Sequence, residues 1–116
     1  MIERTKKLPA RFYLSPMGAN PVRDWILELS DLDRHTIGKD IQKVEFGWPI
    51  GRPNCAPLGQ GLWEVRSGLE HHRIARVIFC IEDGYMILLH AFIKKTQKTP
   101  RAEIELAARR MNEVTR

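Results

Sequence analysis

The sequence predicts an α+β fold: a small antiparallel β-sheet meander with two N-terminal helices and a C-terminal helix. Apolar residues recur at helical spacing between Pro21 and Val44 and again after Pro100. Between Leu62 and Ile93 they instead form short runs typical of strands. The expected order is β-α-α-β-β-β-α. A length of 116 residues with 43% hydrophobic side chains fits one domain, residues 1–116.

The N-terminal part of the chain predicts one short strand and two helices. Residues 10–14 form an extended run that ends in a Ser-Pro-Met-Gly turn. Asn20 and Pro21 then favour the start of a helix, and Ser30 with Asp31 favours its end and the start of a second helix. The residues expected to face the core are Val22, Trp25, Ile26, Leu29, Leu32, Ile37, Ile41 and Val44.

The C-terminal part predicts a three-stranded meander followed by a helix. Residues 47–61 contain four glycines and three prolines, so we expect a loop there. Strands are expected at 62–67, 73–81 and 85–93, with an Asp-Gly turn between the last two. Pro100 then opens a helix whose apolar face is formed by Ile104, Ala107, Ala108, Met111 and Val114.

Positive charge is concentrated at the two ends of the chain. The net charge is +5, and residues 94–116 hold seven Lys and Arg against three Glu. Residues 1–14 hold four Lys and Arg against one Glu. This distribution favours a polyanion such as RNA as a partner. A basic surface that serves only solubility is the alternative interpretation.

The sequence also indicates the cellular compartment. No apolar run approaches the roughly 20 residues that a membrane-spanning helix needs, and no secretory signal is visible at the N-terminus. Cys55 and Cys80 lack the spacing of a zinc site or a disulfide framework, and Cys80 lies in an apolar run typical of a buried strand. We therefore expect a cytoplasmic protein with no membrane segment and no metal site.

Four segments carry a resemblance to a known family. They are, in order, GQGLWEVRSG, RIARVIFCI, DGYMILLHAFIKKTQKTP and RAEIELAARR, and the upstream NPVRDWILEL helix fits the same pattern. Together they resemble the phage-derived HigB-like branch of the RelE/ParE toxin superfamily. The resemblance covers the chain from about Ala10 to Val114.

The resemblance implies the toxin of a type II toxin–antitoxin system, an endoribonuclease that cuts messenger RNA on the ribosome and is held in check by a cognate antitoxin. Two alternatives stay open. One is a ParE-like inhibitor of DNA gyrase on the same fold, marked by strand arginines that do not converge with the lysine segment. The other is a basic nucleic-acid-binding module without activity, although no recognition-helix or zinc-finger signature is visible.

Two strand arginines are the first candidates for catalysis. RNA cleavage through the 2′-OH needs a group that holds the phosphate and offsets its growing charge, and the forked guanidinium suits both tasks. Arg66 alternates with Trp63 and Val65, so it faces away from the core. Arg76 lies in an otherwise apolar strand, and the resemblance aligns it with an arginine important in RelE-like toxins. The structural alternative for Arg76 is an ion pair with Glu64 or Glu45.

The segment after the last strand supplies the other candidates. The resemblance places Lys95 at the position of an active-site basic residue, which makes it the third expected catalytic residue. Lys94 and Lys98, together with Arg73, are expected RNA contacts, unless the lysines are simply solvated. No carboxylate or histidine cluster is visible, so we expect cleavage without a metal or other cofactor.

Proton transfer has no clear candidate in the sequence. RelE toxins commonly use a tyrosine near the C-terminus, but no aromatic residue follows Phe92 here. His90 is the histidine nearest to the lysines, and its apolar strand favours a hydrogen-bonded core role. A lysine acting as base is the remaining alternative.

Overall fold

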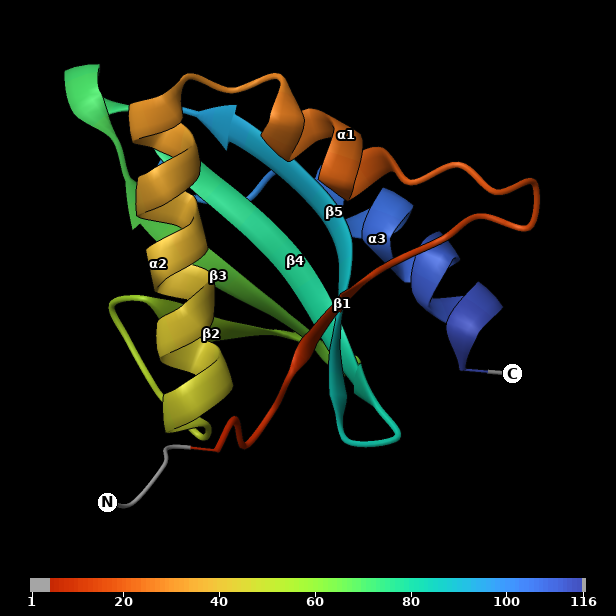
Figure 1. The fold of residues 1–116 in the computed structure, drawn as a ribbon. Coiled ribbons are helices and arrows are strands. Elements are labelled where there is room, and N and C mark those ends of the chain that lie inside the picture. Colours follow the sequence, from red (N-terminus) through yellow and green to blue (C-terminus); the bar gives the residue numbers. More distant parts are fainter. Residues whose placement is uncertain (1–4, 116) are drawn as a thin grey trace.

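Five strands form one mixed sheet, with two helices on one face and a third on the other (Figure 1). The computed structural model of the chain describes residues 5–115, so residues 1–4 and 116 of the predicted domain lie outside the described part. The elements are β1 Ala10–Phe12, α1 Pro21–Leu27, α2 Asp31–Gly47, β2 Cys55–Gly59, β3 Leu62–Gly68, β4 Ile74–Glu82, β5 Tyr85–Lys94 and α3 Arg101–Val114, with a 3₁₀ turn at Glu70–His72.

The sheet has the strand order β1-β5-β4-β3-β2. Strands β2 to β5 form an antiparallel meander, which confirms the predicted meander of the last three strands. Strand β1 adds to the outer edge of β5 in parallel, so the sheet is mixed rather than purely antiparallel.

The prediction of a loop throughout residues 47–61 is wrong for Cys55–Gly59, which forms strand β2. Proline is tolerated in a sheet at an edge, because its missing N–H is not needed on the side that faces solvent. Strand β2 is such an edge, and its register shifts between Pro57 and Gly59. Glycine and proline content therefore concealed a short, irregular edge strand.

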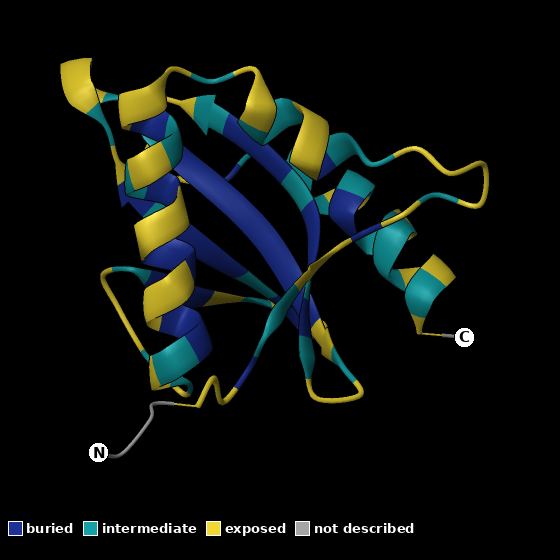
Figure 2. Ribbon diagram, viewed as in Figure 1, coloured by how far each residue is buried: buried dark blue, intermediate teal, exposed yellow. Residues whose placement is uncertain are grey.

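Helices α1 and α2 cover one face of the sheet. The hydroxyl of Ser30 caps α2 by accepting a hydrogen bond from the backbone N–H of Asp33 at 3.2 Å, as the sequence predicts. Ile37, Ile41 and Val44 are buried against the sheet, whereas Leu32 is exposed, contrary to its predicted place in the core. The outer side of α2 is exposed along its length (Figure 2).

Helix α3 covers the opposite face with the apolar residues that its spacing predicts. Ala107 is fully buried, and Ile104, Ala108, Met111 and Val114 pack around it. The strand residues beneath α3 are Leu62, Ile78, Cys80, Leu89 and Phe92. Within residues 5–115, no helix combines the length and the apolar character needed to cross a bilayer.

Candidate functional site

Two arginines lie side by side on the α3 face of the sheet. Arg66 of β3 and Arg76 of β4 are direct partners across the two strands. Both alternate with apolar residues that face α2, namely Val65 and Val77, which places their side chains on the α3 side. Arg66 lies within β3, which ends at Gly68. Arg66 and Arg76 therefore lie next to each other on one face of the sheet.

Arg76 is fully buried, with 0% of its surface exposed. Its Nη2 donates to the backbone carbonyls of Thr96 at 2.6 Å and Gln97 at 2.7 Å. Burial lowers the pKa of its guanidinium, and the nearby carboxylate of Glu64 partly opposes that shift. Its Nε and Nη1 have no hydrogen-bond partner among the described residues. Arg76 therefore holds the segment that follows β5, and in this conformation the segment shields it from solvent.

Glu64 is the counterion that the two arginines share. Its carboxylate oxygens lie 3.9 Å from Nε of Arg66 and 3.9 Å from Nε of Arg76. The hydroxyl of Thr99 donates to the same carboxylate at 2.5 Å. Glu64 is only 5% exposed, and such a buried charge is tolerated only when it is paired and hydrogen-bonded. One carboxylate thus balances two guanidinium groups and leaves the cluster with a net positive charge.

Arg66 is the accessible member of the pair. Its side chain is 24% exposed, and its Nη2 donates to the Gln97 carbonyl at 3.3 Å. The same carbonyl accepts from Arg76, so both arginines converge on residue 97. An anion arriving from solvent can reach Arg66 without displacing any part of the chain.

The predicted lysines all lie at the surface. Lys94, Lys95 and Lys98 are exposed, and Lys98 lines a pocket of about 350 Å³ together with Arg66 and Glu64. Lys95 belongs to the segment that Arg76 holds through the Thr96 and Gln97 carbonyls. The buried arginine therefore fixes the backbone that carries these cations.

Arg73 lies apart from this cluster, on the α2 side of the sheet. Its guanidinium makes a bidentate ion pair with Asp33, at 2.8 and 3.1 Å, and donates from Nε to the Glu70 carbonyl at 3.0 Å. The hydrogen bonds that Arg73 donates to Asp33 lower the pKa of Asp33 and raise the pKa of Arg73. The guanidinium of Arg73 thus links the start of β4 to α2. Contact between Arg73 and RNA stays a prediction.

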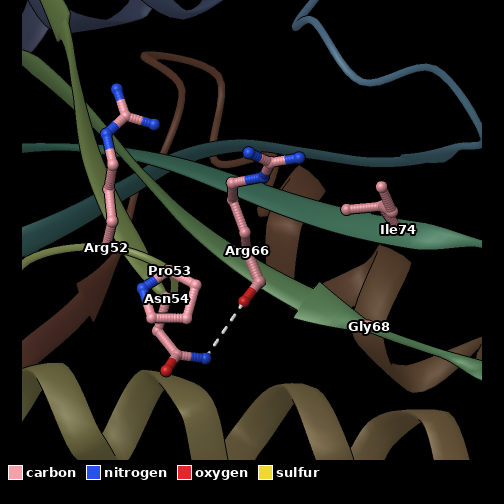
Figure 3. A pocket seen from close by; sticks show the side chains of 6 residues that line it. All are labelled: Arg52, Pro53, Asn54, Arg66, Gly68 and Ile74. Carbon is pink, nitrogen blue, oxygen red and sulfur yellow. Dashed lines mark hydrogen bonds between the residues drawn. The ribbon is translucent and has the colours of Figure 1, made fainter.

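Sequence reasoning missed Arg52 and Asn54, which precede β2. Arg52, Pro53 and Asn54 line a pocket of about 420 Å³ together with Arg66, Gly68 and Ile74 (Figure 3). The available signal was that Arg52 is the one charged residue within the glycine- and proline-rich stretch 47–61. Its position next to Arg66 depends on strand β2, which the sequence did not predict.

The tyrosines and His90 lie outside the two pockets that Arg66 lines. Tyr13 is buried under α3 and donates a short hydrogen bond to Glu113, and its burial raises the pKa of the phenol. His90 is half-buried and bonded to Glu103 at 2.9 Å, as expected for a hydrogen-bonded core histidine. Glu64 is the sole acidic residue among those lining the two pockets.

No cluster of three or more His, Cys, Asp or Glu side chains within residues 5–115 is arranged to hold a metal ion. Cys55 and Cys80 are free and buried, and burial raises the pKa of each thiol to about 11. The side chains that line the two pockets of Arg66 offer guanidinium, ammonium and hydroxyl groups with one carboxylate.

The fold is that of a RelE-like α+β protein, with a cationic cluster on the face of the sheet that α3 only partly covers. The chain belongs to the family described as Phage derived protein Gp49-like (DUF891), which matches residues 24–112. This is a phage-derived, toxin-like family of the RelE/HigB type, and a toxin of such a family implies an antitoxin partner. No curated protein matches the chain.

Proposed function

We propose that this protein is the toxin of a type II toxin–antitoxin system and that it cleaves messenger RNA on the ribosome. The observation that carries the proposal is the convergence of Arg66 and Arg76 on the segment with Lys95 and Lys98. A gyrase inhibitor on the same fold has no need of this convergence, so the arrangement favours the nuclease. Family membership supports the toxin class and leaves the target to be tested.

Arg66 is the residue that contacts the scissile phosphate in this proposal. It is accessible, and its fork can bind two phosphate oxygens while offsetting the charge that grows as the 2′-OH attacks. Lys95 and Lys98 add exposed positive charge along the RNA backbone. Lys94, which is also exposed, extends the same cationic surface.

Arg76 holds the backbone of this site in place. It fixes the carbonyls of Thr96 and Gln97, and through them the backbone next to Lys95 and Lys98. Its two free donors reach a phosphate only if residues 95–99 are displaced. Arg76 thus acts first as a positioning residue, and direct phosphate contact requires a rearrangement of that segment.

The antitoxin is proposed to act by covering the cationic surface. An acidic segment, most simply a helix, would neutralise Arg66 and the lysines and exclude RNA from the same place. A structure of the toxin–antitoxin complex tests this directly. Arg66, Lys95 and Lys98 all open to solvent in that complex would contradict simple occlusion.

Ribosome-dependent cleavage can be tested with purified protein in a reconstituted translation reaction. We expect cuts within the messenger RNA only while ribosomes translate it, mapped by primer extension. Arg66→Ala should lose most of the activity, whereas Arg23→Ala should keep it, because Arg23 is an exposed residue of α1 paired only with its neighbour Asp24. Intact messenger RNA with folded wild-type protein would refute the proposal.

A further inference from the structure

A pocket between the segment before β2 and the end of β3 has the composition of an anion site. Two arginines, Arg52 and Arg66, line it, and none of its six lining residues is acidic. Arg52 is exposed and makes no ion pair with any of the described carboxylates. Arg34, Arg73 and Arg101, by contrast, each form an ion pair with a carboxylate. The guanidinium of Arg52 has no such partner and is therefore free to bind a ligand.

The position of Arg52 is built into the backbone. The N–H of Arg66 donates to the Asn54 carbonyl at 2.7 Å, and Nδ2 of Asn54 donates back to the Arg66 carbonyl at 3.5 Å. The N–H of Cys55 closes a turn onto the Gly51 carbonyl at 3.3 Å. Figure 3 shows the side chains of Arg52 and Arg66 extending to the same side, while Asn54 turns the other way to meet the backbone of Arg66.

The size and walls of the pocket suit a nucleotide better than a bare phosphate. Its volume of about 420 Å³ falls in the range of about 300–1,000 Å³ that small-molecule sites occupy. Pro53 and Ile74 supply apolar walls, and a guanidinium plane can stack on a nucleobase. Charge for the phosphate and apolar side chains for the base therefore occur together.

Arg52 and Arg66 line this pocket and also the one that contains Lys98 and Glu64, so the two pockets are neighbours. A single strand crossing Arg66 would place one nucleotide in each pocket. We propose that the pocket of Arg52, Pro53 and Ile74 binds the nucleotide of single-stranded RNA next to the phosphate held by Arg66, with Arg52 contacting its phosphate or base. This rests on the proposed function, because the register assumes that Arg66 holds the scissile phosphate.

The subsite can be tested by RNA binding without cleavage. The probe is a fluorescently labelled six-nucleotide RNA with 2′-O-methyl groups, which cannot be cleaved because the attacking hydroxyl is blocked. We expect Arg52→Ala to weaken its binding to the full-length protein about tenfold and to lower the slope of log affinity against log salt by about 1. Arg23→Ala is the matched control and should bind like the wild type.

A second series of probes locates the base. Removing one base at a time from the RNA should weaken wild-type binding most at one position, and Arg52→Ala should abolish that difference because the two changes remove the same contact. Arg52→Lys keeps the charge but not the planar fork, so it should restore the salt slope and not the base effect. Unchanged melting temperatures of the variants show that they are folded.

Three results would overturn the subsite: no binding of the probe by the wild type, wild-type affinity and salt slope in Arg52→Ala, or equal losses in Arg52→Ala and Arg23→Ala. The proposed function fails separately. If translated messenger RNA stays intact while Arg52→Ala still weakens binding, the nuclease is refuted and the pocket stands as an RNA-binding site without a scissile phosphate beside it. If messenger RNA is cut and Arg52→Ala binds like the wild type, only the subsite is refuted.

Discussion

The two faces of the sheet are formed by the same strands but differ in where their charged side chains lie. The strand residues beneath α1 and α2 are chiefly apolar, and the ion pair of Arg73 with Asp33 stands at the rim of that face. On the α3 face, Glu64 and Arg76 are buried within the sheet itself. Buried charges add little net stability even when paired, so Glu64 and Arg76 contribute less to the stability of the sheet than apolar residues at the same strand positions would. The buried charges of the first face, Asp33, Asp40 and Glu45, belong to helix α2, whereas those of the α3 face belong to the strands themselves.

The largest effect is expected from Arg76→Ala. Removing the fully buried guanidinium takes away one of the two counterions of Glu64 and the strongest donor to the Thr96 and Gln97 carbonyls, and breaking a buried pair in this way costs about 3–5 kcal/mol. Urea denaturation of the purified variants measures the free energy of unfolding, with Arg73→Ala as the comparison on the opposite face. A loss below about 1 kcal/mol for Arg76→Ala would contradict its positioning role.

Arg66→Ala should separate activity from stability. The side chain is partly exposed and makes only one long hydrogen bond, so we expect unfolding to change by less than about 1 kcal/mol. Removal of a charge-stabilising donor should nonetheless lower messenger RNA cleavage about 10²–10³-fold. Arg66→Lys should recover little, because an ammonium lacks the fork. A stable, fully active Arg66→Ala would remove Arg66 from the catalytic set.

Acid should weaken the α2 face through Asp33. The pKa of Asp33 is lowered in the folded protein, mainly by the hydrogen bond from Arg73, relative to an ordinary value of 3.8. Its contribution to stability is therefore fully present above that ordinary value and is lost as the pH falls through the folded pKa. Denaturation at a series of pH values from neutral down to strong acid measures the effect. In Asp33→Asn the free energy of unfolding should fall less steeply with decreasing pH over this acid range. The same slope as in the wild type would contradict a stabilising role for ionised Asp33.

The smallest expected effect is a difference in the labelling rates of the two thiols. Each thiol lies on a different face of the sheet, so its rate reports how readily that face opens. Cys55 belongs to the cluster under α2 and Cys80 to the cluster under α3, and the pKa of each is raised by burial to about 11. Both should react slowly with a thiol reagent at pH 8 and fully after denaturation. Within residues 5–115 the α3 cluster has seven buried residues against thirteen, so Cys80 should be labelled first. Faster labelling of Cys55 would show instead that the α2 face opens more readily than the α3 face.

The sequence predicted the elements whose signals are local. Ser30, the Asp83-Gly84 turn and the apolar face of α3 each depend on neighbours within a few residues, and each is observed. Strand β2 was missed because its glycine and proline content resembles a loop and because an edge strand needs fewer hydrogen bonds. The parallel pairing of β1 joins distant parts of the chain, which no local pattern encodes.

The candidate site was predicted only in part for the same reason. Alternation along one strand was enough to place Arg73 and Arg76 on opposite faces, but the choice of Arg76 as a catalytic candidate beside Arg66 rested on the family resemblance. The burial of Arg76 depends on the path of residues 95–99, and the role of Arg52 depends on β2. A charged residue in an apolar strand needs a partner, and for Arg76 that partner is mainly a pair of backbone carbonyls, which carry no sequence signature.

The parallel pairing of β1 with β5 bears on the order in which the chain folds. Strands β2 to β5 form a meander of short connections, so their contacts close small loops early. Strand β1 pairs Ala10 with Met86 and therefore closes a loop of residues 10–86, about two-thirds of the chain. We expect β1 to dock last, onto a sheet that has already formed. Deleting β1 should therefore have little effect on the rate at which strands β2 to β5 fold.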